Sequence, residues 1–115
     1  MYTKKSPRAR GKTMPTGTMN GLESRYVREV LEPRRIAEDV FSYDFEAIKL
    51  RLAKKTFYTP DFVVVRSDGA VEFHEVKGFW EDDARVKIKV AAARFPCFLF
   101  VAAQHKKKQW QTEEF

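Results

Sequence analysis

The order of apolar and polar positions along the chain predicts two helices with a group of strands between them. Apolar residues recur at helical spacing from Leu22 to Leu31, and Asn20 before them is a favourable N-cap. Pro33 is expected to end this first helix. Residues 81–95 carry a second apolar stripe at helical spacing, and a proline follows them.

Between the helices, period-two patterns predict strands. Residues 40–45 alternate in part and residues 48–52 alternate clearly. The stretch 44–47 is either a turn between two strands or a bend within one long strand. Residues 57–66 are apolar on both faces, which is typical of a central strand that is covered on both sides.

A turn at residues 67–69, with glycine at its end, leads from that strand into a partner at 71–77. The apolar run 97–101 predicts a buried strand. It is expected to lie parallel to 71–77 because a helix connects the two. Residues 104–115 are expected to form a short helix around Trp110 or to fray.

These elements predict an α/β fold in which one mixed central sheet is flanked by helices. A chain of 115 residues leaves little room for a second domain, so residues 21–115 are expected to form one unit. Residues 1–20 are expected to be a flexible basic arm, either solvated or in contact with phosphates. Its basic residues are Lys4, Lys5, Arg8, Arg10 and Lys12.

Charge and cysteine content narrow the class of protein. The net charge of +6 favours an acidic partner, with nucleic acid as the default. Cys97 is the only cysteine, which excludes an intramolecular disulfide and a cysteine-based zinc site. The sequence has neither a long apolar run nor a secretory signal pattern. We therefore expect a cytoplasmic protein with no membrane partner, in the host cytoplasm if a phage encodes it.

Three charged residues form the candidate chemical group. Asp61 follows Pro60 at a strand start, and Glu75 and Lys77 share one face near the end of the next strand. A hairpin would bring them together, and two carboxylates beside an ammonium suit a divalent metal and a phosphate. Mg²⁺ is the expected ion, with Mn²⁺ able to substitute, and no small-molecule cofactor is expected. The backbone carbonyl of Val76 is a candidate third ligand, while Lys77 would orient water or stabilise charge at phosphorus.

The alternative interpretation of these residues is purely structural. Asp61 would then open a turn, and Glu75 and Lys77 would be a solvated pair on an edge strand. Glu23 also has two interpretations, because it lies beside the buried stripe of the first helix but is well placed to form a capping box with Asn20.

Other polar and aromatic residues have less specific signals. His74 faces away from Glu75 and is expected to be a packed or hydrogen-bonded residue of the sheet, and Trp80 is expected to pack. The remaining basic residues are either phosphate contacts or solvated side chains. They are Arg85, Lys87 and Lys89 on the second helix, with Lys106 and Lys107 near the C-terminus.

Two segments carry a resemblance to a known family. Residues 58–62 read Tyr-Thr-Pro-Asp-Phe, and residues 75–81 read Glu-Val-Lys-Gly-Phe-Trp-Glu. This pattern resembles the PD-(D/E)xK nuclease superfamily, whose restriction-endonuclease-like core has the order αβββαβ. Within it, the segments look like the endonuclease I junction resolvases of lytic phages and like small phage endonuclease-like proteins.

The resemblance implies a metal-dependent DNA endonuclease that is structure-selective, like a Holliday junction resolvase, and acts on branched DNA. It implies Asp61 and Glu75 as metal ligands, Lys77 as the catalytic lysine, and Glu23 as a further catalytic and metal-binding acid. A resolvase makes two paired incisions, so a homodimer is expected. The alternatives are a nicking, restriction-like or packaging-associated nuclease, a non-catalytic DNA-binding module on the same fold, and a basic accessory protein that binds a phage partner.

Overall fold

The computed structural model describes residues 19–115 and shows a mixed α/β fold built on a five-stranded sheet. The strands lie in the order β1-β4-β5-β6-β7, and a separate two-stranded sheet pairs β2 with β3. The helical elements are α1 (Gly21–Tyr26), η2 (Val27–Leu31), α2 (Glu32–Ile36) and α3 (Asp82–Arg94). The strands are β1 (Val40–Phe45), β2 (Leu50–Ala53), β3 (Thr56–Tyr58), β4 (Phe62–Arg66), β5 (Val71–Lys77), β6 (Leu99–Lys106) and β7 (Gln109–Glu114).

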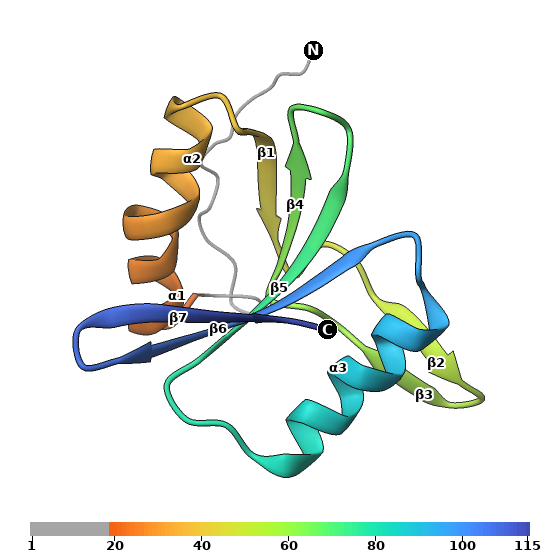
Figure 1. Cartoon of the computed structure of the whole chain (residues 1–115). Coiled ribbons are helices and arrows are strands. Elements are labelled where there is room, and N and C mark those ends of the chain that lie inside the picture. The colour runs from red at the N-terminus through yellow and green to blue at the C-terminus, as the bar shows by residue number, and fades with distance from the viewer. Residues whose placement is uncertain (1–18) are drawn as a thin grey trace.

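Helices cover the two faces of the main sheet (Figure 1). The helix α1–η2–α2 packs on one face through a core that includes Tyr26, Leu31 and Phe62. On the other face, α3 and the β2–β3 hairpin share a second core with Phe73 and Phe100. The prediction of one mixed sheet with flanking helices is therefore confirmed, and so is the parallel pairing of β5 with β6.

The first helix runs past Pro33, so the prediction that Pro33 ends it was wrong. The segment η2 is a π turn, in which the N–H of Glu32 reaches back to the carbonyl of Val27. This wider turn changes the hydrogen-bonding partners just before the proline. Pro33 then occupies the first turn of α2, where a missing N–H costs little.

The predicted single strand over residues 57–66 is instead two strands in two sheets. Pro60 has no N–H to donate, and the chain bends at residues 59–61 between β3 and β4. As a result β3 pairs with β2, whereas β4 lies in the middle of the main sheet between β1 and β5. The turn after β4 is as predicted, with Gly69 at φ 93°.

The C-terminal segment also differs from the prediction of a short helix or a frayed end. Residues 109–114 form β7, which pairs antiparallel with β6 through a two-residue turn. The turn residues Lys107 and Lys108 have φ values of 53° and 63°, the left-handed conformation that a type I′ turn needs. Glycine or asparagine normally marks such a turn, so a pair of lysines gave no signal of it.

A chain of hydrogen-bonded polar groups lies between α1–η2–α2 and the face of the sheet that these helices cover. The hydroxyl of Tyr26 forms a hydrogen bond of 2.6 Å with Nδ1 of His74, and Nε2 of His74 lies 2.7 Å from Oε1 of Glu72. Arg34 and Arg66 donate to the same Glu72 carboxylate at 3.3 and 3.4 Å. A carboxylate only accepts, so the bond between His74 and Glu72 requires a proton on Nε2. The predicted structural role of His74 is confirmed, because this histidine is buried and fully hydrogen-bonded.

Candidate functional site

The start of β4 and the end of β5 bring the predicted charged residues together. Phe62 pairs with His74 in the β4–β5 ladder, and this pair is the last one before the chain bends. Asp61, one residue before Phe62, is therefore level with Glu75, one residue after His74. Glu75 and Lys77 point to the face that α3 and the β2–β3 hairpin cover, because His74 and Val76 face the other core.

Asp61 takes the place of a missing strand partner. The residues before Phe62 do not pair with β5, so the N–H of Val76 has no strand carbonyl opposite it. That N–H donates instead to Oδ2 of Asp61 at 2.8 Å. The N–H and C=O of a strand residue point to the same edge, so the Val76 carbonyl lies on the Asp61 side of β5.

Glu75 is held by two donors. The Tyr58 hydroxyl donates to its Oε1 at 2.6 Å, and the Lys77 ammonium lies 3.2 Å from its Oε2. Asp61 and Glu75 each have 8% exposure, so two acids share a site that is largely withdrawn from water. The interpretation of Glu75 and Lys77 as a solvated edge-strand pair is wrong, because β5 is central and Glu75 is buried.

Burial and mutual repulsion shift the pKa values in this group. Burial is the largest cause that raises the pKa of Asp61, and the negative charge of Glu75 is the second. The hydrogen bond from the Val76 N–H lowers this pKa, but the net result is a value of about 8. Burial by itself lowers the pKa of Lys77. The charge and the hydrogen bond of Glu75, together with the charges of Asp61 and Glu23, outweigh burial, so the pKa of Lys77 is raised overall. Lys77 is thus protonated at neutral pH, and the raised pKa of Asp61 means that this acid keeps its proton while no further positive charge is present.

Glu23 has the capping role and also lies within electrostatic reach of the site. Its Oε1 accepts from the N–H of Asn20 at 3.0 Å, and its own N–H donates to the Asn20 side chain at 2.8 Å. This is the predicted capping box. At the same time, the charge of Glu23 contributes to the raised pKa values of Asp61 and Lys77.

Within residues 19–115, no three histidine, cysteine, aspartate or glutamate side chains converge closely enough to hold a metal ion together. The candidate metal ligands are therefore two carboxylates and one backbone carbonyl, and Glu23 is an acid whose charge reaches this group. This set fits Mg²⁺, which takes hard oxygen ligands and keeps several of its waters.

The predicted DNA-binding residues are not gathered in one place. Arg85 is engaged within the protein, because it forms two bonds of 3.0 and 2.9 Å with Glu113 and lies over the rings of Trp80 and Phe115. Lys106 and Lys107 lie at the β6–β7 turn, and Lys87 lines a pocket beside Lys77. Lys89 is close enough to Glu113 to lower the pKa of that acid, although Arg85 is the main cause. Positions 1–18 of the predicted basic arm, which include all five of its basic residues, lie outside the residues that the structure describes.

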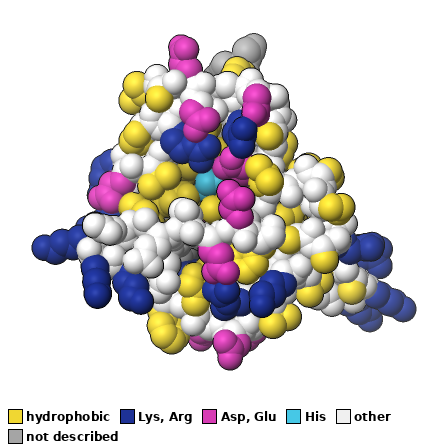
Figure 2. Space-filling view, viewed as in Figure 1, with side chains coloured by type: hydrophobic (Ala, Val, Ile, Leu, Met, Phe, Trp, Pro, Cys, Tyr) yellow, Lys and Arg dark blue, Asp and Glu magenta, His cyan; other side chains and the backbone are white. Residues whose placement is uncertain are grey.

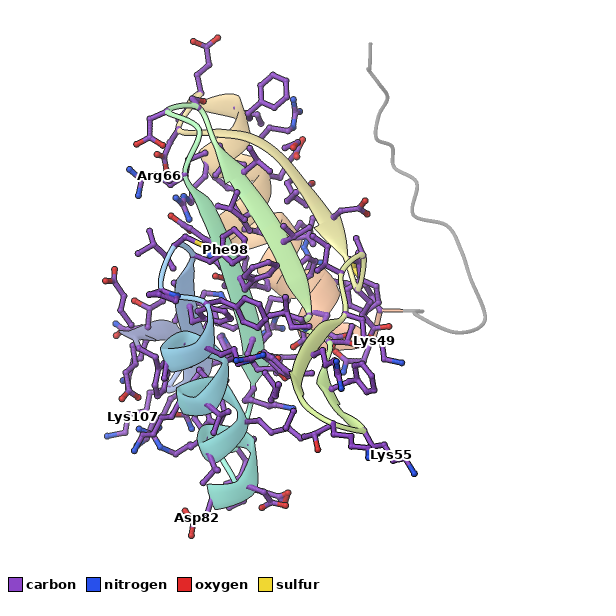
Figure 3. The ribbon with its side chains drawn as sticks, turned by 90° about the vertical axis from the view of Figure 1, so that its right-hand side faces the viewer. Lys49, Lys55, Arg66, Asp82, Phe98 and Lys107 are labelled. Carbon is purple, nitrogen blue, oxygen red and sulfur yellow. The ribbon has the colours of Figure 1, made fainter. Side chains whose placement is uncertain are left out.

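Acidic side chains run down the middle of the face that Figure 2 shows, and basic side chains project at both of its edges. Figure 1 places the β6–β7 turn at one edge and the β2–β3 hairpin at the other. Lys107 and Lys108 form the β6–β7 turn, and Lys54 and Lys55 form the turn of the β2–β3 hairpin. Figure 3 likewise shows Lys107 and Lys55 on opposite sides of the molecule.

Three residues near the site were not predicted to take part in it. Tyr58 was part of the aromatic motif, but periodicity does not reveal a hydroxyl that reaches Glu75. Lys49 is exposed, as its place in the alternating pattern of residues 48–52 indicates, and it also lines the pocket that contains Glu75. The N–H of Glu46 donates to the Asp61 carbonyl at 2.8 Å. Partial burial of the Glu46 carboxyl group raises its pKa, and so do the negative charges of Glu23 and Glu75.

Comparisons with protein-family models, with curated proteins and with solved structures find no match to this chain. None of the helices within residues 19–115 combines the length and apolarity that crossing a bilayer requires.

Proposed function

We propose that this chain is a divalent-metal-dependent DNA endonuclease with a restriction-endonuclease-like core. The observation that carries the proposal is the meeting of Asp61, Glu75 and Lys77 where β4 begins and β5 ends. The succession of the first helix, β1, β4, β5, α3 and β6 supports it, because it follows the order αβββαβ. The β2–β3 hairpin and β7 are additions to that order.

Asp61, Glu75 and the Val76 carbonyl would hold Mg²⁺ or Mn²⁺, and Glu23 would act through an intervening water. The ion supplies positive charge for phosphate oxygens and for the activation of water. The donor set fits such an ion because only a proton on Asp61 balances the second buried carboxylate, and a bound cation would take the place of that proton. The N–H of Val76 and the hydroxyl of Tyr58 fix the orientation of the two carboxylates.

Lys77 is the residue that we assign to the reacting phosphate. Its ammonium is protonated and already lies 3.2 Å from Glu75, so it can donate to an attacking water or to a phosphate oxygen without rearrangement of the strand. Preference for branched DNA, action as a homodimer and a phage origin belong to the proposal through the sequence resemblance.

Cleavage assays test the proposed function. The whole protein is incubated with labelled four-way junctions, nicked duplex and linear duplex, in Mg²⁺ and in EDTA. We expect cleavage in Mg²⁺ only, with junctions cut fastest, and a rate at least about a hundredfold lower for Lys77→Met. Lys54→Met, at the exposed hairpin turn, is the matched control and should cleave like the unchanged protein.

Each outcome of this assay bears on a different part of the proposal. If no DNA is cleaved in Mg²⁺ or Mn²⁺, the protein is not a nuclease, and retained junction binding would identify a non-catalytic DNA-binding module. If linear duplex is cut as fast as junctions, the preference for branched DNA is wrong and the nuclease assignment stands.

Replacing Tyr58 with phenylalanine should weaken the response to metal while the fold persists. The substitution removes the hydroxyl that positions Glu75 and leaves the buried ring in place. We expect a cleavage rate about tenfold to a hundredfold lower, with a higher Mg²⁺ concentration needed for half-maximal rate. The Mg²⁺ titration separates this positioning role from a structural one, because a loss of folded protein would lower the rate equally at every Mg²⁺ concentration.

A further inference from the structure

A pocket lies beside the candidate site, between the β2–β3 hairpin and α3. It has a volume of about 420 Å³, and its lining includes Tyr58, Glu75 and Lys77. Figures 1 and 3 show the hairpin and α3 on the same side of the sheet, and Figure 3 shows Lys49 beside the hairpin. The pocket therefore opens directly onto the residues that we assign to catalysis.

Positive charge dominates this pocket. Its three lysines come from three elements, since Lys49 precedes β2, Lys77 ends β5 and Lys87 lies on α3. Of the described residues that line the pocket, only Glu75 is acidic, and Lys77 pairs with it. Neither Lys49 nor Lys87 forms an ion pair with any acid in residues 19–115, so their charges are available to a ligand.

Both of these lysines gather around Phe57. The ammonium of Lys49 lies 4.6 Å from the centre of the Phe57 ring, and that of Lys87 donates to the Phe57 carbonyl at 3.4 Å. Phe57 has 41% exposure, so part of this residue is open to a ligand. Two ammonium groups next to an exposed aromatic ring match the two parts of a nucleotide, because lysines bind its phosphate and an aromatic face stacks on its base.

We propose that this pocket binds one nucleotide of the nucleic-acid strand that enters the site, with its phosphate on Lys49 and Lys87 and its base on Phe57. The proposal rests on the proposed function in taking a nucleic-acid strand as the ligand. It adds a subsite that uses neither the Asp61 carboxylate nor the metal. The subsite lies next to Lys77, so it would hold a nucleotide that neighbours the reacting phosphate.

Binding of deoxyadenosine monophosphate in EDTA tests this subsite without catalysis. Amide NMR spectra of the whole protein are recorded during titration with this nucleotide and, separately, with deoxyadenosine. We expect saturable shifts at residues 57–59 with the nucleotide, and binding at least about fivefold weaker in Lys49→Met and in Lys87→Met. Methionine keeps the unbranched stem of lysine, so packing is preserved, and unchanged spectra away from the pocket verify the fold. Lys54→Met should bind as the unchanged protein does.

The subsite is wrong if the nucleotide does not bind, if deoxyadenosine binds equally well, or if both pocket variants bind like the Lys54→Met control. Cleavage assays on the same variants keep this failure distinct from that of the proposed function. Metal-dependent cleavage without nucleotide binding would overturn the subsite alone. Nucleotide binding that depends on Lys49 and Lys87, in a protein that cleaves no DNA, would support the subsite and overturn the nuclease.

Discussion

Replacing Asp61 with asparagine should abolish metal-dependent cleavage and make the metal-free protein more stable. Asparagine has the same shape and can still accept the hydrogen bond from Val76, but it carries no charge beside Glu75. The pKa of Asp61 is raised to about 8 in the folded protein, whereas an exposed aspartate titrates near 4. Between these values the folded state binds more protons than the unfolded chain, so the stability of the unchanged protein falls as pH rises from about 4 to about 8.

Thermal unfolding in EDTA at pH 8 measures this effect. We expect Asp61→Asn to gain about 2 kcal/mol or more at pH 8, which is about 10 °C in the unfolding midpoint, and much less at pH 4. Added Mg²⁺ should raise the midpoint of the unchanged protein only. Asp44→Asn removes an exposed carboxylate and is the control. A lower midpoint for Asp61→Asn at pH 8 would show that the buried carboxylate is already compensated without metal.

Replacing Glu72 with glutamine should destabilise the fold by about 3 kcal/mol at neutral pH. Glu72 accepts from His74, Arg34 and Arg66, and its side chain has only 8% exposure. The neutral amide cannot balance the two guanidinium groups, and loss of one partner in a buried ionic group is costly. Asp39→Asn is the matched control, because Asp39 pairs with the same Arg34 at 52% exposure and should cost less than about 1 kcal/mol.

The pH dependence of this loss can be stated in advance. The hydrogen bond from His74 lowers the pKa of Glu72, and the bond from Arg34 lowers it further. These bonds outweigh burial, which raises the pKa, and the net value is about 2. Its stabilising contribution is therefore complete above about pH 4.5, the usual range for a glutamate, and is lost as pH falls toward 2. Urea unfolding at several pH values should show the two proteins converging below pH 4.5. A constant difference down to pH 2 would mean that the charge of Glu72 is not what stabilises the fold.

Much of the fold follows from local rules of sequence. The patterns of residues 71–77 and 81–95 predict β5 and α3, and Gly69 marks the turn before β5. The parallel pairing of β5 with β6 follows from the helix that connects them, because a helical crossover returns the chain to the end of the sheet where the first strand began. These elements were predictable because each depends on periodicity or on a residue with a special backbone conformation.

The departures from prediction depend on partners that are distant in sequence. Pro33 was expected to end the helix, but a π turn precedes it and the chain continues into α2, which apolar spacing alone does not predict. Pro60 marked a strand start correctly, yet nothing local shows that the residues before it belong to another sheet. The β7 strand has no glycine turn and few buried residues, and its pairing with β6 and its bonds to Glu29 and Arg85 hold it in place.

The candidate site shows the same division. Alternation along a strand was enough to place Glu75 and Lys77 on one face, and a hairpin was enough to bring Asp61 to them. The contacts that orient these groups come from elsewhere, since Tyr58 reaches Glu75 from the small sheet and Lys49 reaches the pocket from the loop before β2. Those contacts require the tertiary fold and have no signature in the spacing of residues.

The alternation of β5 places two incompatible environments one residue apart. Glu75 and Lys77 face the candidate site, whereas Glu72 and His74 face the opposite core, where arginines and a tyrosine satisfy them. A slip of a single residue would exchange the two sets and leave every one of these charges without its partner. We therefore expect this strand to tolerate insertions and deletions far less than its polar sequence suggests. Its charged residues specify the alignment of the whole sheet as strictly as a row of apolar side chains would.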